Sequence, residues 1–319
     1  MTGRPTVLML RALGLGDFLT GLPAIRLVRS ALPEHRLVLA APEAVRPLTD
    51  LSPDIDALFA VGELEPLTGF PRHISVGIDL HGKGPASRRL LEDVEPDRVV
   101  GFGHPPSGRP GPVWRADEHE VDRWCRLVAE AFAVPGRAPS VRGTLAVPER
   151  AVPRGRTIVH PGAAATARRW PATRFADVVA ALAAAGHDVV VTGGRSEHDL
   201  ARAVAGSVAD PVTDLDLASL SALVAHARLL VCGDTGVAHL ASAFGVASVV
   251  LFGPVSPNSW GPPEDGPHQV IWHGDGLGNP HGSSPDPALL AISVAEVLDA
   301  VATLDVRPSG PVSTPGLPR

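Results

Sequence analysis

The stretch that decides the fold is LLVCGDTGVAHLASAFGVASVVLFGP, residues 229–254. It opens on an apolar run typical of a buried strand and then reaches a glycine-containing turn at 233–236. A helix over 237–244 and a second apolar strand over 247–252 follow, and the stretch closes on Gly-Pro. A strand, a tight turn, a helix and another strand in this order predict a βαβ unit with parallel strands.

The same alternation continues along the chain away from this unit. Residues 157–160 predict a strand, 171–185 a helix and 188–192 another strand. An earlier series begins with a strand over 6–11, followed by a helix from Asp17 onward. Two such series predict an α/β fold made of two Rossmann-like, doubly wound domains that face a central cleft.

The domain organisation follows from the length of 319 residues and from one linker-like segment. We expect the first domain to span 1–153 and the second to span 154–290, with the Pro-rich end of the first serving as the connection. A C-terminal helix over 291–305 could pack back on the N-terminal domain. Residues 306–319 are rich in Pro and Ser and are expected to form a disordered tail.

Composition excludes several classes of function. The formal net charge is -6 and there is no long basic run, so nucleic acid is not an expected partner. No apolar stretch approaches the roughly 20 residues that a membrane span needs, so no stable membrane insertion is expected. We expect no secretion signal, and Cys125 and Cys232 fit reduced, buried thiols. These features predict a cytoplasmic protein and leave its oligomeric state open.

The strongest candidate site lies in the turn that opens the helix over 237–244. Ligands of parallel sheets bind beyond the carboxyl ends of the strands, which is where Asp234, Thr235 and Gly236 lie. Backbone N–H groups and the positive end of the helix dipole make such a turn an anion site, and His239 follows on the first turn. The alternative is that Asp234 only caps the helix and His239 is an ordinary surface histidine.

Other polar residues follow neighbouring strands of the second domain. Arg168 and Arg169 precede Pro171 at a helix start and could grip a diphosphate with both guanidinium groups, although a solvated basic pair is the commoner fate. Further turns allow a ligand to approach the backbone closely. These turns contain Pro161 and Gly162 after the strand ending at His160, and Thr192 and Gly193 with Glu197 one helical turn beyond.

The first domain offers two turns at the ends of its strands. Gly14-Leu15-Gly16-Asp17 suggests a dinucleotide fingerprint, but Leu19 stands where that motif needs its third glycine. An NAD-dependent oxidoreductase is therefore disfavoured. The second turn, Asp79-Leu80-His81-Gly82, ends another strand and should face the same cleft.

Two Asp-x-Asp strings raise the question of a metal site. Asp54 and Asp56 lie in a predicted loop, whereas Asp214 and Asp216 precede a helix and fit a helix cap. The sequence also lacks an H-E-x-x-H pair. We therefore expect no metal site.

Together these motifs resemble glycosyltransferase family 9, the heptosyltransferase family, whose members have the two-domain GT-B fold. The resemblance extends from about residue 6 to about residue 304. Its most specific part is the Asp-Thr-Gly-x-x-His block with the trailing Gly-Pro. The matching residues are Gly16-Asp17, Leu22-Pro23-Ala24, Asp79-Leu80-His81-Gly82, His160-Pro161-Gly162, Arg169-Trp170-Pro171, Gly233-Asp234-Thr235-Gly236, His239, Phe252-Gly253-Pro254 and Leu290–Leu298.

This resemblance implies an inverting, metal-independent transfer of a sugar, in this family a heptose, from a nucleotide diphosphate such as ADP-heptose. No cofactor is implied, and the acceptor would be a carbohydrate, a glycolipid or a small molecule. Asp17 becomes the general base, and Asp79 and His81 lie on the acceptor side, in the domain over 1–153. The donor-binding residues of the second domain, with Gly16 of the first, are Pro161, Gly162, Arg168, Arg169, Thr192, Gly193, Glu197 at the ribose, Leu215 at the nucleobase, Asp234, Thr235, Gly236, His239, Gly253 and Pro254.

The chain also departs from the family pattern. Arg168 stands where the family commonly has a lysine, and Ala163 and Ala164 replace hydroxyl residues of some members. Two other functions stay open on the same fold. One is a sugar-nucleotide epimerase or phosphorylase, which needs no second sugar, and the other is a non-catalytic protein that binds a nucleotide sugar.

Overall fold

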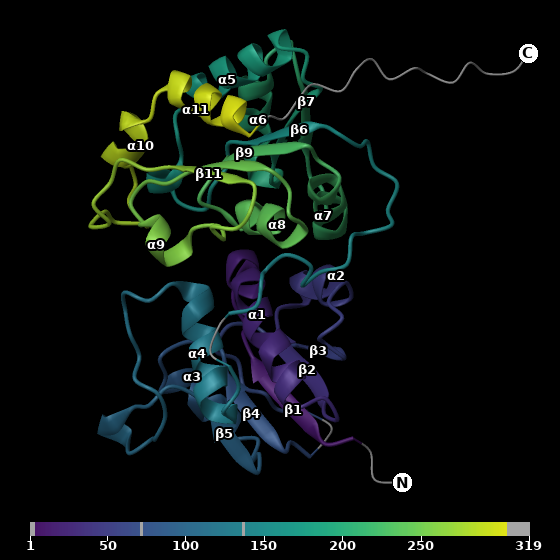
Figure 1. Ribbon diagram of the computed structural model, residues 1–319, viewed down its shortest axis with the longest axis vertical. Coiled ribbons are helices and arrows are strands. Elements are labelled where there is room, and N and C mark those ends of the chain that lie inside the picture. The colour runs from purple at the N-terminus through teal and green to yellow at the C-terminus, as the bar shows by residue number, and fades with distance from the viewer. Residues whose placement is uncertain (1–3, 71–72, 136–137, 305–319) are drawn as a thin grey trace, which may run out of the picture. The chain divides into compact units, whose positions relative to one another are not determined.

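The computed structural model describes residues 4–70, 73–135 and 138–304, and it divides into two compact units (Figure 1). The first unit is Met1–Glu149 with the short segments Ser242–Gly245 and Asn258–Pro263, and the second is the remainder. The boundary after residue 153 remains a prediction about independently folding domains. The predicted disordered tail over 306–319 lies outside the described residues.

The first unit is built on a five-stranded parallel sheet with the order β3-β2-β1-β4-β5. Its strands are β1 (Thr6–Leu10), β2 (Arg36–Ala41), β3 (Ala57–Ala60), β4 (Val76–Asp79) and β5 (Arg98–Val100). Every residue of β1 is buried, so its unbroken apolar run was a clear strand signal. The strand order reverses between β1 and β4, so a crevice is expected at their carboxyl ends.

The helices of this unit correct the predicted start of the first helix. They are α1 (Leu15–Ala31), η1 (Glu43–Val45), α2 (Arg46–Thr49), α3 (Ala86–Glu92), η2 (Pro105–Ser107) and α4 (Glu120–Phe132). Helix α1 begins at Leu15, two residues before the predicted start at Asp17, with Gly14 as its N-cap and Asp17 in its first turn. Helix α4 buries Glu120 and Arg123 beside Trp124.

The second unit contains a six-stranded parallel sheet with the order β11-β10-β9-β6-β7-β8. Its strands are β6 (Thr157–His160), β7 (Val189–Gly193), β8 (Asp210–Thr213), β9 (Leu229–Gly233), β10 (Ser248–Leu251) and β11 (His268–Ile271). The order reverses between β6 and β9, where His160 pairs with Cys232. The turns after these two strands therefore lie side by side.

The helices of the second unit complete the doubly wound α/β fold. They are η3 (Thr166–Arg168), α5 (Ala172–Ala184), η4 (Arg195–Glu197), α6 (His198–Ala205), α7 (Leu217–Ala225), α8 (Gly236–Phe244), α9 (Pro257–Trp260), α10 (Pro287–Ala291) and α11 (Val294–Thr303). Among the helices of the described ranges, none combines the length and hydropathy that a membrane span requires.

Helix α11 corrects one further expectation. Its Val297 and Val301 belong to the same buried cluster as Val178 and Leu182 of α5. The helix therefore packs within the second unit, instead of returning to the N-terminal domain as its position in the sequence suggested. Its apolar stripe fills the space beside α5, and burying that stripe stabilises the unit.

Candidate active site

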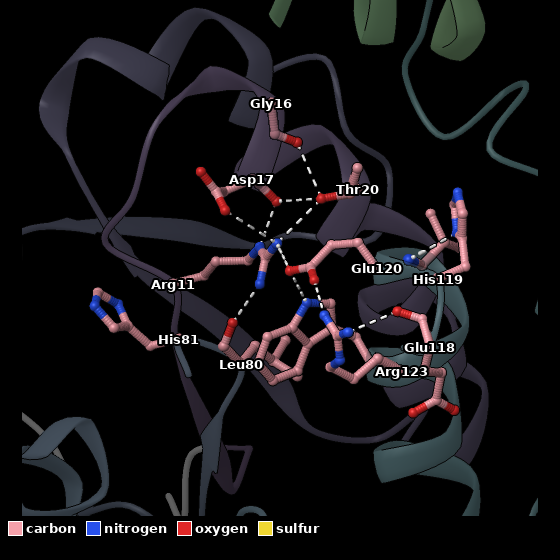
Figure 2. Close-up of polar contacts among 12 residues, drawn as sticks. Arg11, Gly16, Asp17, Thr20, Leu80, His81, Glu118, His119, Glu120 and Arg123 are labelled. Atoms are coloured by element: carbon pink, nitrogen blue, oxygen red, sulfur yellow. Dashed lines mark hydrogen bonds and ion pairs between the residues drawn. The ribbon is translucent and has the colours of Figure 1, made fainter. Parts of the chain in front are cut away.

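Asp17 lies in the first turn of α1, directly beyond the carboxyl end of β1 (Figure 2). Its carboxylate is 31% exposed and lies 3.8 Å from the guanidinium of Arg11. Burial raises the pKa of Asp17, Arg11 opposes that shift, and Glu120 adds to it. A carboxylate with a raised pKa is a better proton acceptor, so the environment suits a general base.

The turn that carries Asp17 is held by hydrogen bonds of α1. The Thr20 hydroxyl lies 3.0 Å from the carbonyl oxygen of Gly16 and 3.1 Å from that of Asp17, and it can donate to either (Figure 2). Gly16 thus lies in a fixed first helical turn beside the candidate base. Its predicted contact with the donor stays a prediction.

His81 and Asp79 lie at the end of β4, next to β1. The N–H of Ala12 donates to Nδ1 of His81 at 3.2 Å, which leaves the proton of a neutral ring on Nε2. Burial lowers the pKa of His81, and Arg11 lowers it further, so the neutral ring is favoured. His81 therefore presents an N–H donor of fixed tautomer.

Asp79 is 1% exposed, and its predicted place on the acceptor side stays a prediction. Its carboxylate accepts hydrogen bonds from the N–H of His81 at 3.0 Å and from the hydroxyl of Ser87 at 2.8 Å. Burial raises its pKa to about 6. We interpret Asp79 as the residue that holds the His81 turn, because its own oxygens are engaged.

In the second unit, Arg168 and Asp234 meet at the carboxyl ends of β6 and β9. Nη1 of Arg168 lies 3.7 Å from Oδ2 of Asp234, and the carbonyl of Arg168 packs against Gly233, where a Cβ atom would approach within 3.2 Å. Burial raises the pKa of Asp234, and Arg168 opposes the shift. Nε of Arg168 is buried without a hydrogen-bond partner among the described residues.

Arg169 and Glu197 form a second pair at this edge. Nε of Arg169 donates to the carbonyl of Ala163 at 2.9 Å, and its Nη2 lies 3.8 Å from Glu197. The N–H of Gly194 donates to Glu197 at 2.9 Å. A Cβ atom at Gly162 would overlap the Glu197 carboxylate, so glycine there lets Glu197 keep this position.

The ends of β6 and β7 bring His160 and Thr192 together near the Arg169–Glu197 pair. Nδ1 of His160 and Oγ1 of Thr192 lie 3.0 Å apart, which links the ends of β6 and β7. Burial lowers the pKa of His160, although the nearby Glu197 opposes the shift. Pro161 and Gly193 follow directly in the chain and so lie at the same edge.

Helix α8 begins at Gly236, immediately after Asp234 and Thr235. His239 lies on its first turn and is 8% exposed. The first N–H groups of an α-helix have no partner within the helix, so they and the helix dipole face the Arg168 side of the edge. The predicted anion site at this helix start stays a prediction.

Gly253 and Leu215 are two predicted donor residues in different surroundings: Gly253 is constrained by packing, and Leu215 follows a strand distant from β9. At Gly253 a Cβ atom would meet Leu289 at 2.7 Å, and the Gly253 carbonyl accepts from Nε1 of Trp272 at 3.0 Å, so packing alone requires a glycine here. Pro254 follows it after β10. Leu215 is partly buried after β8, which lies at the far end of the sheet order from β9.

The Asp-x-Asp strings are engaged within the protein. Asp54 and Asp56 form ion pairs with Arg26 at 3.0 Å and with Arg29 at 2.6 Å. Asp216 caps α7, which confirms its predicted role. Over residues 4–70, 73–135 and 138–304, no group of three or more His, Cys, Asp or Glu side chains could hold a metal ion.

Sequence reasoning missed the partners of Asp17. Arg11 was only the residue that ends the first apolar run, and Glu120 carried no signal because it lies 109 residues away in the chain. A charged residue directly after a buried strand, followed by a glycine turn and an acid, could have singled out Arg11. Nothing in the local sequence identifies its partner.

The family profile and a curated relative indicate the same family. The profile of glycosyltransferase family 9 (heptosyltransferase) matches residues 112–275, just over half of the chain. The chain is 31% identical over 165 residues to lipopolysaccharide heptosyltransferase 3 of Escherichia coli, which covers 49% of this chain and 48% of that protein. The chain therefore matches about half the length of this curated relative.

Solved structures show the same fold over nearly the whole chain. A family 9 glycosyl transferase from Veillonella parvula matches with a TM-score of 0.79 and 19% identity, over 95% of this chain and 98% of that one. The ADP-heptose lipopolysaccharide heptosyltransferase II of E. coli matches with a TM-score of 0.78 and 20% identity, over 94% and 98%. At these identities the matches establish the fold, and they confirm the predicted α/β architecture of the GT-B type.

Proposed function

The chain belongs to glycosyltransferase family 9, and we propose that it transfers a sugar from a nucleotide diphosphate to an acceptor hydroxyl with inversion at the anomeric carbon. The observation that carries the proposal is the family match over 112–275, because this segment contains the donor-side residues from Pro161 to Pro254. ADP-heptose is the donor we expect, since similar proteins are named as heptosyltransferases and one as using ADP-heptose.

The donor diphosphate would bind at the start of α8. Two phosphate groups need positive charge and N–H donors, and the helix start supplies both. Arg168 adds a guanidinium whose Nε is unpartnered among the described residues, and Arg169 adds a second one that is 39% exposed. These groups would stabilise the charge that develops on the leaving diphosphate, which is a function that a divalent cation performs in other enzymes. We therefore propose transfer without a metal ion.

Asp17 would act on the acceptor. Its carboxylate takes the proton of the acceptor hydroxyl while that oxygen forms a bond to the anomeric carbon. The bond from the anomeric carbon to the diphosphate oxygen breaks, and its electron pair leaves with the nucleoside diphosphate. A single displacement on the face opposite to the leaving group inverts the configuration, and such a base typically contributes about 10²–10⁴-fold in rate.

His81 would orient the acceptor. Its Nε2–H is available because Ala12 engages Nδ1, and the lowered pKa keeps the ring neutral. A neutral donor suits a hydroxyl-bearing acceptor. A carbohydrate, a glycolipid or a small molecule would each meet this requirement.

The test is a transfer assay with purified protein. ADP-heptose is compared with GDP-, UDP- and dTDP-sugars, with and without acceptor and with and without EDTA, and release of nucleoside diphosphate is measured. We expect acceptor-dependent release that EDTA does not abolish and a product of inverted configuration by NMR. Conversion of the donor without acceptor would favour an epimerase or phosphorylase. Thermal stabilisation by a nucleotide without turnover would favour a binding protein.

A further inference from the structure

We infer that the buried guanidinium of Arg11, paired with Glu120, positions the Asp17 carboxylate and sets its basicity. Figure 2 shows Arg11 reaching from the end of β1 between the Asp17 turn and the Leu80 carbonyl, with Glu120 approaching from α4. Arg11 is thus a positioning residue that acts through Asp17. The inference rests on the proposed role of Asp17 as the base.

The side chain of Arg11 is fully enclosed, with 0% exposure. Its Nε donates to the carbonyl of Asp17 and its Nη1 to the carbonyl of Leu80. Its Nη2 donates to the Thr20 hydroxyl at 3.1 Å and to Glu120 at 3.2 Å. Arg11 therefore ties together the ends of β1 and β4 and the first turn of α1, which carries the base.

Glu120 stabilises the buried charge of the Arg11 guanidinium. An isolated buried ion costs several kcal/mol, whereas a hydrogen-bonded pair recovers much of that cost. Glu120 is 7% exposed and accepts from Arg11, from Arg123 and, at 2.6 Å, from Nε1 of Trp124. Glu120 therefore offsets part of the Arg11 charge, because it shares its single negative charge with Arg123.

The distance to Asp17 has a chemical consequence. At 3.8 Å, Nη2 of Arg11 is too far from the Asp17 carboxylate for a hydrogen bond, but close enough to act on its charge. Arg11 thus leaves the carboxylate oxygens available to an acceptor hydroxyl. A direct salt bridge would instead engage them and weaken Asp17 as a base.

Helix α1 is adapted to this arrangement at Gly21. A Cβ atom there would lie 2.7 Å from Cδ of Arg11 and 2.8 Å from its Nε, closer than real contacts allow. Glycine inside a helix costs roughly 0.5–1 kcal/mol relative to alanine. Its presence at this position makes room for the arginine.

The charged groups around Asp17 act on its proton in opposite directions. They are Arg11 at the end of β1, Glu120 and Arg123 on α4, and the titratable His81 after β4. Burial raises the pKa of Asp17, Arg11 lowers it and Glu120 raises it. Removing Arg11 or Glu120 separately should therefore move the basicity of Asp17 in opposite directions, which a purely structural role would not do.

The experiment compares Arg11→Gln, Glu120→Gln and the double variant by the pH dependence of kcat/KM for the acceptor. The rate falls where Asp17 becomes protonated. Loss of the Arg11 charge should move this acidic limb about 1–3 pH units upward. Loss of the Glu120 charge should move it roughly 0.5–1 unit downward. The double variant should return the limb toward its original position while kcat stays low, because the bond to the Asp17 carbonyl is lost.

Glu118→Gln is the matched control. Glu118 also pairs with an arginine, Arg126, at 2.7 Å and is 13% exposed, and within the described ranges its side chain forms no ion pair with Arg11. We expect no shift of the acidic limb in this variant. If Arg11→Gln fails to fold, the downward shift in Glu120→Gln, measured against this control, still decides.

A second readout does not depend on activity. The side-chain carboxyl signal of Asp17 in protein labelled with [γ-13C]aspartate, assigned by its absence in Asp17→Asn, reports the pKa directly. Opposite shifts of that pKa in the two single variants support the inference even if Asp17→Asn stays active and the proposed base is wrong. An unshifted pKa, or shifts in the same direction, overturns it, and a loss of rate without a pKa shift makes Arg11 merely structural.

Discussion

The two units use arginine in contrasting ways. In the first, Arg11 is fully enclosed and donates to two carbonyls, a hydroxyl and a carboxylate. In the second, Arg168 and Arg169 are 30% and 39% exposed, and they lie 3.7 and 3.8 Å from Asp234 and Glu197. The N–H groups of Arg11 donate to partners inside the protein, whereas Arg168 and Arg169 have N–H groups that could donate to a ligand.

This contrast suggests different functions for the carboxyl ends of the strands in the two units. A closed network fixes geometry and basicity, so its disruption should lower the rate of a chemical step. Loosely paired cations beside a helix start suit a bound anion, so their loss should weaken affinity for the donor. The contrast would be contradicted by a variant of the first unit that changes only donor affinity, or by a variant of Arg168 or Arg169 that changes only kcat.

The largest effect is expected at the edge of the first unit. Asp17→Asn keeps the size of the side chain and removes its basicity, so kcat should fall about 10²–10⁴-fold with near-normal donor affinity. Asn is compatible with the first turn of α1, whose N-cap is Gly14, so the melting temperature should change little. Steady-state kinetics and nucleotide titration measure the two parameters. A stable variant with full activity would remove Asp17 from the mechanism.

The next effect concerns the open arginine. Arg168→Ala should weaken binding of ADP by about 1.5 kcal/mol, roughly tenfold in Kd, because one charge-assisted contact is lost. Arg168→Lys should recover only part of this, since an ammonium lacks the planar fork. Isothermal titration measures the affinity.

The control for this prediction is Arg156→Ala. Arg156 precedes β6 at the opposite edge of the sheet and pairs with Asp188 at 3.0 Å and Asp210 at 3.1 Å. Its loss should leave donor affinity unchanged. Equal weakening in both variants would mean that general destabilisation, and not a phosphate contact, explains the loss at Arg168.

Sequence patterns predicted the strands at the centre of each sheet well. β1, β6 and β9 are buried at every residue and contain apolar runs, and each was placed within a residue or so at either end. The edge strands β8 and β11 were missed because they are half-exposed and lack such runs, and the sequence of β8 includes a proline. Tertiary pairing, and not local pattern, makes these segments strands.

The site followed the same rule. Residues placed by a strand end or a helix start, such as Asp17 and Asp234, could be found from local sequence. The Arg11–Glu120 pair could not, because helical periodicity assigns charged residues to the surface and the two lie in distant segments. A buried ion pair is a property of the folded chain.

The pH dependence of stability tests the enclosed network of the first unit at Asp79, which lies at the end of β4. The pKa of Asp79 is raised to about 6 in the folded protein, against about 3.9 in the unfolded chain. The folded state therefore binds the proton more tightly, and its stability falls as pH rises through this window. Between pH 5 and pH 7 the loss should be about 1 kcal/mol.

Asp79→Asn tests this assignment because it cannot titrate. Its melting temperature relative to the wild type should rise by roughly 2–4 °C on going from pH 5 to pH 7. Differential scanning fluorimetry at both pH values measures the change. A constant difference between the two proteins would mean that the Asp79 carboxyl does not carry a raised pKa, and that this edge is less closed than its burial indicates.

The smallest effect compares two glycines around Glu197. A Cβ atom at Gly162 would overlap the Glu197 carboxylate, whereas at Gly194 it would lie 3.6 Å from the same group, an ordinary contact. Gly162→Ala should therefore displace Glu197 and weaken ADP binding by about 1 kcal/mol, roughly fivefold, through loss of one hydrogen bond. Gly194→Ala should leave the affinity unchanged, because its backbone angle suits alanine and its N–H still donates to Glu197. Both affinities can be measured by titration with ADP. If the two variants bind ADP equally well, Glu197 does not contact the nucleotide. The proposed donor site would then consist of the arginines and the start of α8 alone.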